Sequence, residues 1–467
     1  MTQTATHKAG HAEPASTLKE RRRVVLATTI GTAIEWYDYF LYAAVAGLVF
    51  NQVMFGPLDG GLATVVSFMT VGLSFFFRPF GAFLAGHFGD RLGRRVVLMV
   101  TLFAMGSATT LIGVLPTFET AGVLAPILLI ALRIIQGISA GGEWGSAVLM
   151  AVEHAPNGKR GLFGSGPQMG VPIGLLLSSA VLAVMTKIAP GDAFIQWGWR
   201  VPFLLSIVLV IIGYWVRIGV DESPVFEEIA QRKEQEAENP LKRLFSQHGL
   251  LVLVAALLFA GNNAVGYMTT GGYIQNYSTN PDGIGLDRGA VLVAVSVSGV
   301  TWMVFTLLAG WVSDRIGRRT TYLIGFVVQA LGAAALFPLV NTGSIAMLYV
   351  ALIFLTLGLG LTYGQQSATY AELFPAPIRS SGVSIAYAIG AVLGGAFAPT
   401  IAAALVNATG TTFAVSGYLV TASIVGLIAA FVLRERGGIP LGPEHEEIQS
   451  QGHFVFQPHP AKRSENA

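Results

Sequence analysis

The chain has 467 residues, of which 53% are hydrophobic, only 12% are charged and none is cysteine. A typical soluble domain carries about 25% charged residues, so this composition excludes a large soluble enzyme, a nucleic-acid-binding protein and a disordered scaffold. The lack of cysteine excludes a disulfide framework and any thiolate metal or redox site. The formal net charge of +2 favours no partner by itself. The apolar runs, each near the ~20 residues that cross a bilayer, indicate an integral membrane protein.

Apolar runs divide the chain into twelve predicted spans. These spans must be helices, because backbone groups cannot stay unpaired in lipid and the runs lack the alternation of barrel strands. The first six spans cover residues 24–50, 62–86, 96–115, 123–152, 162–186 and 200–220. The other six cover residues 248–278, 289–312, 320–340, 344–371, 380–407 and 411–433. We expect an all-α integral membrane protein with two six-helix bundles.

The distribution of lysine and arginine sets the predicted orientation. These residues gather in the polar start, the even-numbered connections and the tail, whereas the odd-numbered connections hold only Lys187, Arg200 and Arg288. The positive-inside rule then places both termini in the cytoplasm. The start lacks a convincing signal-peptide cleavage site, so we expect the first span to be retained. The predicted units are a cytoplasmic segment 1–23, a bundle 24–220, a cytoplasmic loop 221–247, a bundle 248–433 and a mobile cytoplasmic tail 434–467.

A ten-residue pattern occurs once in each half, between the second and third spans. The sequence Gly86-His-Phe-Gly-Asp90-Arg91-Leu-Gly93-Arg94-Arg95 recurs as Gly310-Trp-Val-Ser-Asp314-Arg315-Ile-Gly317-Arg318-Arg319. A looser repeat relates Glu153…Arg160-Gly161 to Glu372…Arg379 with Gly382. Parallel duplication of a six-helix unit is one transporter plan, with the substrate held between the halves near the membrane centre. A membrane receptor or channel, the nearest other class, has no evident need of the repeat.

The repeated loop pattern, the six-plus-six layout and Arg133-x-x-Gln136-Gly137 in the fourth span resemble the major facilitator superfamily. Four segments resemble the metabolite:proton symporter family more narrowly: Glu35-Trp36-Tyr37-Asp38, Arg78-Pro79, Gly141-Gly142-Glu143-Trp144-Gly145 and Trp197-Gly198-Trp199-Arg200. The resemblance covers residues 24–436 and implies the major facilitator fold and proton-coupled uptake by alternating access. Members of that family carry shikimate, 2-oxoglutarate, citrate, or proline and betaine, so the resemblance leaves the solute open.

The resemblance also implies that the two repeated loops latch the halves together in one access state without touching the substrate. The implied gating residues are Asp90, Arg91, Arg94, Asp314, Arg315 and Arg318, with Glu153, Arg160, Glu372 and Arg379 as partners. A simpler alternative is that the loops are turns and topology anchors. Their aspartates can cap the next helix, and their arginines can bind anionic lipid head groups.

Five charged residues fall inside predicted spans, all in the first half: Glu35, Asp38, Arg78, Arg133 and Glu143. A charge in the hydrocarbon costs about 2.5–3.5 kcal/mol on insertion scales, so each must be paired, hydrated or functional. Glu35 lies about 16 Å along the first helix, near the membrane centre, and Asp38 is expected on the same face. Two such carboxylates repel when both are ionised, so one is expected to bind a proton. The alternative is that each carboxylate neutralises an arginine and holds the bundle together.

The other intramembrane charges have two or more predicted roles. Arg78, before Pro79 near the cytoplasmic end of its span, either serves the solute site or only pairs and snorkels. Arg133 lies centrally, with Gln136 on about the same face, and either binds an anion or pairs with a first-helix carboxylate. Glu143 lies about 15 Å beyond Arg133 between glycines that allow close packing. Packing, gating and proton binding stay open for it.

Uncharged polar residues dominate the spans of the second half. The predicted solute-contact residues there are Asn263, Tyr267, Tyr363 and Gln366. Buried amides can also simply bridge helices. In the first span, Tyr39 and Tyr42 follow the two carboxylates by four positions and are the better aromatic candidates for lining the path.

A charged wall facing a neutral polar wall suits a small polar solute. Two membrane arginines favour a shikimate-, keto- or hydroxy-carboxylate, whereas carriers of zwitterions share the motifs that hold these arginines. A proline/glycine betaine symporter is therefore the alternative, although the tail lacks the heptads of the osmosensing members. With no phosphate loop and no His or Cys cluster, we expect no ATP, metal or other cofactor, no enzyme activity and no nucleic-acid partner. The expected protein is a monomeric, multi-pass cell-membrane symporter that meets solute, protons and lipid and is driven by the proton gradient.

Overall fold

The computed structural model describes residues 18–58, 60–92, 94–156, 158–218, 240–270, 272–281 and 283–457. Within these ranges, the side chains of residues 18–20, 60, 85–98, 217–218, 240 and 269–270 are not described. The predicted segment 1–23 and the predicted loop 221–247 therefore lie largely outside the described residues.

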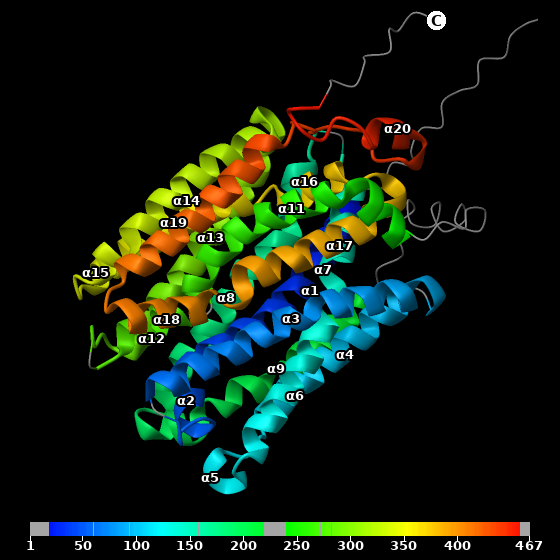
Figure 1. The fold of residues 1–467 in the computed structure, drawn as a ribbon. Helices are drawn as coiled ribbons and strands as arrows, with labels where there is room; N and C mark the ends of the chain where they lie inside the picture. Colours follow the sequence, from blue (N-terminus) through cyan, green and yellow to red (C-terminus); the bar gives the residue numbers. More distant parts are fainter. Residues whose placement is uncertain are drawn as a thin grey trace, which may run out of the picture.

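The first half of the chain forms long helices that run side by side through the molecule, with short turns at their ends (Figure 1). In chain order they are α1 (Leu18–Val45), the π-helical turn η1 (Ala46–Phe50), α2 (Asn51–Val53), α3 (Gly60–Leu92), α4 (Arg94–Ile112), α5 (Phe118–Ala121), α6 (Leu124–Ala140), α7 (Glu143–Glu153), α8 (Arg160–Ile188), η2 (Phe194–Gly198) and α9 (Arg200–Ile218).

The second half repeats this arrangement. Its elements are α11 (Pro240–Thr270), α12 (Tyr273–Thr279), α13 (Arg288–Ile316), α14 (Arg318–Val340), α15 (Ile345–Tyr363), α16 (Gln366–Leu373), η3 (Ala376–Ile378), α17 (Arg379–Gly390), η4 (Ala391–Ala396), α18 (Ala398–Thr409) and α19 (Phe413–Val432). Beyond α19 come two short turns, η5 (Pro443–His445) and α20 (Glu446–Gln449). The end of the molecule that carries these turns is called the tail end below.

Ten helical segments in the described part of the chain are long and apolar enough to cross a membrane. The predicted spans 24–50 and 96–115 are not among the ten. Helices α1 and α4 occupy these positions, but α1 starts with charged residues and contains two carboxylates, and the apolar part of α4 is limited to Met99–Ile112.

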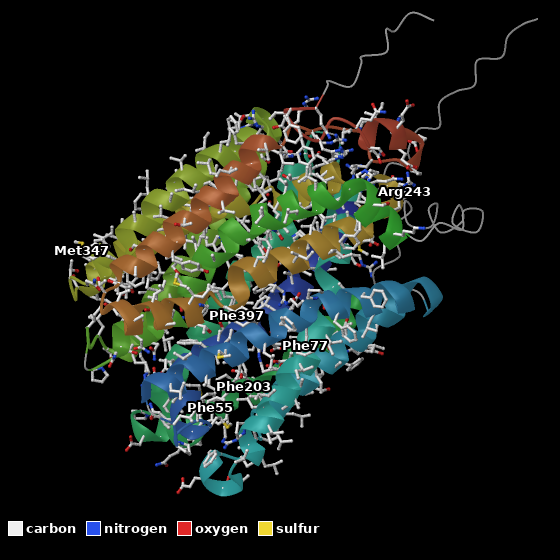
Figure 2. The ribbon with its side chains drawn as sticks, in the orientation of Figure 1. Phe55, Phe77, Phe203, Arg243, Met347 and Phe397 are labelled. Atoms are coloured by element: carbon white, nitrogen blue, oxygen red, sulfur yellow. The ribbon has the colours of Figure 1, made fainter. Side chains whose placement is uncertain are left out.

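Large apolar side chains cover the outer faces of several of these helices. Ile211 on α9 and Leu331 on α14 are both more than half exposed. Met347, which Figure 2 places at the outer edge of the molecule, is 38% exposed, whereas Phe203 is fully buried. Exposed side chains of this kind would be costly in water but suit a hydrocarbon environment.

The fourth long segment of each half is broken, which the apolar runs did not predict. The break between α6 and α7 lies at Gly141–Gly142, and the break between α15 and α16 lies at Gly364–Gln365. Helix α11 also differs from the prediction, because it starts at Pro240 inside the predicted loop and kinks at His248. Apolar content does not distinguish a straight helix from a broken one, so these features could not be predicted from composition.

Glycines allow close contact between two helices inside each half, at matching positions of the repeat. A Cβ at Gly141 would collide with the carbonyl oxygen of Arg78 on α3, and a Cβ at Gly364 would collide with the carbonyl oxygen of Thr306 on α13. Small residues at such crossings let helix backbones approach closely. The same glycine contact thus joins the second and fourth segments of the first half (α3 and α6) and those of the second half (α13 and α15).

Residues 434–457, part of the tail that the sequence analysis expected to be mobile, pack against the helix bundle. The backbone N–H of Arg434 donates to the carbonyl of His453 (2.9 Å), and the N–H of Val455 donates to Val432 (3.0 Å). Leu441 and Phe454 in this segment are buried. The segment lacks heptads, but its short turns are still held by hydrogen bonds and packing against the helix bundle.

The glycine contact between α3 and α6 yields a stability prediction. A Cβ at Gly137 would collide with the carbonyl oxygen of Ser74, so Gly137→Ala should destabilise the protein by about 1–3 kcal/mol, as overpacking of a tight contact does. Thermal unfolding of the purified protein in detergent would show a lower midpoint.

The matched control is Gly417→Ala in α19, where a Cβ meets no atom within 4 Å. Alanine favours helix over glycine, so this variant should unfold at the same or a higher temperature. An equal loss in both variants would contradict the assigned close contact.

Candidate functional site

A buried ion pair joins α1 and α3 in the centre of the molecule. Arg78 Nη2 lies 3.2 Å from Glu35 Oε1, and the two side chains are only 3% and 2% exposed. The guanidinium also lies over the rings of Trp36 (5.2 Å) and Phe75 (4.3 Å). Burial of both charges is costly, so the pair depends on each partner staying in place.

Arg78 retains hydrogen-bonding capacity beyond this pair. Among the residues that the structure describes, neither Nε nor Nη1 of Arg78 has a hydrogen-bond acceptor. A guanidinium carries five N–H donors in a fixed fork that matches a carboxylate. The arrangement can therefore accept a second anion beside or in place of Glu35.

In Arg133, in contrast, every guanidinium nitrogen has an acceptor. Its Nε donates to the carbonyl of Thr70 (3.1 Å), and Nη2 donates to the carbonyl of Val71 and to Ser74 Oγ (both 3.0 Å). Its Nη1 donates to Gln136 Oε1 (2.8 Å). The predicted alternatives were anion binding and direct pairing with a first-helix carboxylate. The structure instead fastens this arginine to the backbone of α3, with the ring of Tyr42 3.8 Å from the guanidinium carbon.

Asp38 contacts different helices from Glu35, although both were expected on one face. Thr109 of α4 donates to Asp38 Oδ2 (2.9 Å), and Ser206 of α9 donates to Oδ1 (2.8 Å). Gln136 Nε2 in turn donates to Thr109 Oγ1 (2.7 Å). Asp38 is therefore linked to the Arg133 charge through two intervening side chains rather than by direct contact.

Thr109 and Ser206 are site residues that the sequence reasoning missed. A single hydroxyl in an apolar span carries no charge and follows no motif, so nothing marked these two residues. Only the observation that a buried carboxylate needs donors indicated that some hydroxyls must face α1.

A small cavity lies between the two halves, beside Trp36. Its lining comes from α1 and α8 in the first half and from α11, α13 and α15 in the second half: Trp36, Phe40, Val171, Phe259, Asn262, Asn263, Gly266, Tyr267, Trp302 and Tyr363. The predicted contact residues Asn263, Tyr267 and Tyr363 are among them. The cavity is mostly aromatic, which the sequence did not predict.

The remaining predicted contact residues lie outside this lining. Tyr39 packs edge-to-face against Tyr267, with ring centroids 5.4 Å apart. Tyr42 exchanges a hydrogen bond of 2.6 Å with Thr70. Gln366 is buried in α16, nearer the tail end. Within the lining, Asn262 donates to Thr362 Oγ1 (2.6 Å) and so bridges α11 and α15.

Two ion pairs connect the halves at the tail end, and the repeat relates one to the other. Arg160 of α8 lies 3.5 Å from Glu372 of α16, and Glu153 of α7 lies 4.0 Å from Arg379 of α17. Glu153 and Arg160 correspond in the repeat to Glu372 and Arg379, respectively. Each half therefore supplies the acid of one pair and the base of the other.

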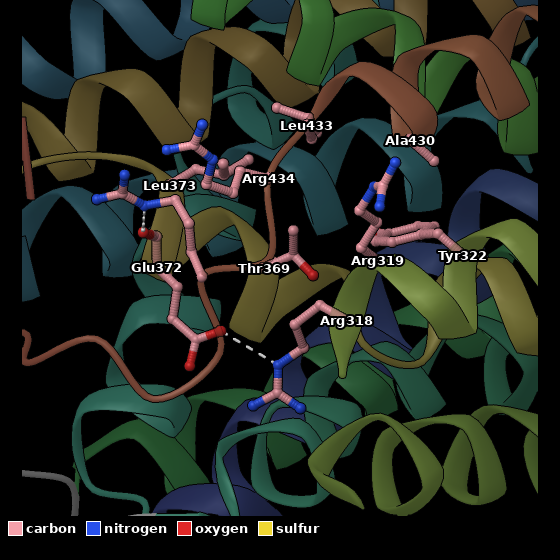
Figure 3. Close-up of a pocket in the computed structure, with 10 residues that line it drawn as sticks. Arg318, Arg319, Tyr322, Thr369, Glu372, Leu373, Ala430, Leu433 and Arg434 are labelled. Carbon is pink, nitrogen blue, oxygen red and sulfur yellow. Dashed lines mark hydrogen bonds and ion pairs between the residues drawn. The ribbon is translucent and has the colours of Figure 1, made fainter. Parts of the chain in front are cut away.

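The second copy of the repeated loop adds to this closure. Asp314 accepts hydrogen bonds from the backbone N–H groups of Gly161 (2.8 Å) and Leu162 (2.9 Å) at the start of α8. Arg318 donates to Asp314 (2.8 Å) and, through Nε, to Glu372 Oε2 (3.1 Å), as Figure 3 shows for Arg318 and Glu372.

The other predicted gating residues are placed differently. Arg315 is exposed and lies over the ring of Trp311 (3.4 Å). Glu143 is buried at the start of α7, next to Trp144, whose ring stacks on Tyr387 with centroids 3.6 Å apart. The side chains of Asp90, Arg91 and Arg94 are among those that the structure does not describe.

The halves also meet at the end opposite the tail. Asn276 of α12 donates to the carbonyl of Gly47 in η1 (2.7 Å). Gly272 has a positive φ of 80° and approaches Ala43 so closely that a Cβ would collide with its carbonyl oxygen. The cavity therefore lies between two zones in which the halves are in contact.

Comparison with known proteins identifies the family. The model of the Major Facilitator Superfamily matches residues 28–399. The inner membrane metabolite transport protein YhjE of Escherichia coli (strain K12) is 38% identical over 91% of this chain and 97% of its own length. The shikimate transporter of the same organism is 37% identical over 90% and 95%. The proline/betaine transporter of this strain is 30% identical over 93% and 88%.

Solved structures support the fold. The proton:xylose symporter XylE bound to 6-bromo-6-deoxy-D-glucose aligns with a TM-score of 0.74 over 93% of this chain and 99% of that chain, at 19% identity. The matched proteins are transporters rather than enzymes. The resemblance found in the sequence is thereby confirmed. The chain is a multi-pass cell-membrane protein that belongs to the major facilitator superfamily, among the metabolite transporters related to the shikimate and proline/betaine carriers.

Proposed function

We propose that the protein is a proton-coupled symporter that imports a small organic acid by alternating access between its two halves. The observation that carries this proposal is the buried Glu35–Arg78 ion pair, which lies beside the cavity between the halves. The 37% identity to a shikimate transporter and the fold of a proton symporter support it.

The ion pair suggests how a proton and a carboxylate would be coupled. A proton that binds the Glu35 carboxylate removes its negative charge and so ends its attraction for Arg78. Arg78 would then be a buried cation without a counter-ion, which is strongly unfavourable. A solute carboxylate that accepts hydrogen bonds from Arg78 restores the charge balance. Proton and anion binding therefore favour one another.

Asp38 is the second proposed proton site. Its two oxygens accept hydrogen bonds from Thr109 and Ser206, so it connects α1 to α4 and α9. Gain or loss of a proton there changes how these helices are held together. Arg133 holds Gln136, and Gln136 holds Thr109, one of the two donors to Asp38, which makes them positioning residues for Asp38 in this proposal.

The proposal includes the topology and the gate. Helices α1 and α4 complete twelve membrane helices, both termini are cytoplasmic, and the tail end is the cytoplasmic side. The two repeat-related ion pairs, with Asp314 and Arg318, form the cytoplasmic gate. The protein works as a monomer, and the proton gradient drives uptake without a cofactor.

A zwitterion such as proline or glycine betaine is the alternative solute. The aromatic lining favours it, because Trp36, Trp302 and Tyr363 surround the cavity and aromatic faces attract quaternary ammonium groups. The carboxylate of such a solute would use Arg78 in the same way. The 30% identity to a proline/betaine transporter supports this second candidate.

Proton entry into liposomes tests the function. Purified protein in liposomes loaded with a pH-sensitive dye should acidify the lumen when shikimate or a related carboxylate is added outside. Protein-free liposomes are the control. Lumen acidification with proline or betaine but not with the carboxylates would favour the alternative solute. If a folded protein causes no acidification with any of these solutes, the result contradicts symport of them.

Removal of either carboxylate charge should separate accumulation from exchange. Glu35→Gln or Asp38→Asn should abolish uphill uptake, because a neutral amide cannot release and rebind the coupling proton. Solute exchange across the membrane at equal pH should persist in at least one variant. The control is Glu119→Gln, since Glu119 is exposed on α5. Normal accumulation in both carboxylate variants would contradict the assignment.

Arg133→Lys should destabilise the protein by about 2–3 kcal/mol, because one ammonium cannot serve four acceptors and leaves some of them buried without a donor. The measurement is thermal unfolding in detergent. Arg315→Lys, at the exposed position over Trp311, is the matched control and should be nearly neutral. Equal unfolding temperatures for both variants would contradict the anchoring role of Arg133.

A further inference from the structure

We propose that residues 434–457 form an intramolecular strap that holds the tail-end gate closed. The strap would set how readily the transporter opens to that side, whichever solute it carries. This inference rests on the alternating-access part of the proposed function and is independent of the solute and of proton coupling.

The strap binds residues that also form the ion pairs between the halves. The N–H of Gly438 donates to Glu372 Oε1 (3.2 Å), and Arg379 Nη1 donates to the carbonyl of Leu441 (2.9 Å). Arg160, which belongs to the first half, donates to the carbonyl of Ile439. The strap thus contacts both halves where they meet, and it shares three of the four ion-pair residues.

Gln449 fixes the shape of the strap. Its side chain is 1% exposed, and its Oε1 accepts from the N–H of Ala376 (2.8 Å) and from Arg379 Nη2 (3.2 Å). Its Nε2 donates to the carbonyls of Pro440 and Gly442 (both 2.8 Å). Both donors and both acceptor positions of the amide are used. An apolar replacement would leave several of these buried groups without partners.

Arg436 ties the strap to α16 and to itself. Its Nε donates to the backbone carbonyl of Glu372 (3.1 Å), and its Nη2 donates to the carbonyls of Ile448 (3.2 Å) and Gln449 (2.8 Å). These bonds hold the strap against the segment that carries Glu372. Hydrogen bonds from a charged donor are stronger than neutral ones, so the segment is anchored rather than loosely packed.

Docking of the strap favours the closed gate because its contacts differ between access states. Opening at the tail end must separate α8 from α16, since Arg160 and Glu372 pair across that junction. The bond from Arg160 to Ile439 is then lost. A docked segment shifts a conformational equilibrium only through such a difference, and here the difference favours closure.

His453 makes this docking sensitive to pH. Its ring is buried, and the neutral ring donates from Nε2 to the carbonyl of Leu373 (3.0 Å). Burial, aided by the charge of Arg436 and the ring of His248, lowers the pKa of His453 to about 3. Other charged groups on the packed elements are Arg243 of α11 and Glu446 of α20, which pair with each other. Two more are Glu372, which precedes Leu373 on α16, and Arg434, whose backbone N–H donates to the carbonyl of His453.

The sign of the pH effect follows from this lowered pKa. Free histidine titrates near pH 6.5, so the undocked strap binds a proton more readily than the docked one. Docking is therefore at full strength above pH 6.5 and weakens as the pH falls below it. Between pH 7.5 and pH 5.5 the docking constant should fall about tenfold. Acidification on the strap side would loosen the gate.

Thiol labelling tests the strap directly, since the natural chain has no cysteine. Ser367→Cys places one thiol on α16 at a fully buried position that faces Gly164 of α8 across the halves. In the purified protein this thiol reacts with a maleimide only when the gate opens. A chain that ends at Leu433 should be labelled about ten times faster than the full chain. A chain that ends at Gln457 keeps the strap and should match the full chain.

Point variants of the full chain test the strap independently, so the test stands even if the chain that ends at Leu433 does not fold. Gln449→Ala should also raise the labelling rate, whereas Ile448→Ala, at a half-exposed strap position, should not. Lowering the pH from 7.5 to 5.5 should raise the rate about tenfold in the full chain and much less in His453→Gln. Each rate is normalised to that of the unfolded chain at the same pH.

Equal normalised rates in the full chain and Gln449→Ala, with both proteins folded, would overturn the strap. The assay needs neither solute nor proton gradient, so its outcome is separate from the liposome test. If the strap variants are labelled faster than the full chain but the protein transports no solute, the strap proposal is supported and only the symport proposal is contradicted.

Discussion

The interior of this protein depends on one constraint: a charge buried away from water must find its compensation within the chain. Three charged groups of the first half satisfy it in different ways. Each guanidinium nitrogen of Arg133 donates to a backbone or side-chain acceptor of α3 or α6. Asp38 is held by hydroxyl groups of two helices. Arg78 faces one carboxylate, and within the described part of the chain its Nε and Nη1 have no acceptor, which is why the proposed function places the solute carboxylate there.

The repeat explains why the gate is reciprocal. Two copies of one unit related by a pseudo-twofold axis present equivalent surfaces to each other, so a contact from residue i to residue j is accompanied by one from j to i. Glu153–Arg379 and Arg160–Glu372 form such a set. The glycine contacts of α3 with α6 and of α13 with α15 repeat the same packing inside each half. The strap breaks this symmetry, because it follows only the second copy.

Much of the fold could be predicted from the sequence, because membrane helices follow from apolar runs. The helix breaks at Gly141 and Gly364 could not be predicted, since apolar content carries no information about helix bending. At the site, the charged residues were identified by the cost of burying them, but their partners were not. Helical spacing placed Glu35 and Asp38 on one face, whereas packing turned them to different helices. Thr109, Ser206 and the aromatic lining around Trp302 become recognisable only when the helices are assembled.

The two broken segments have a consequence for leakage. Glu153 and Glu372, which belong to the proposed gate, lie on α7 and α16, which follow the breaks in the chain. Arg133 lies on α6 and Tyr363 on α15, which precede the breaks. A small change of angle at Gly141–Gly142 and Gly364–Gln365 can therefore move the pieces that follow the breaks while the pieces that precede them stay packed. In the proposed transport cycle, the tail-end contacts would then separate without disturbing the lining of the cavity beside Trp36, which would keep a continuous path for ions from opening during the transition.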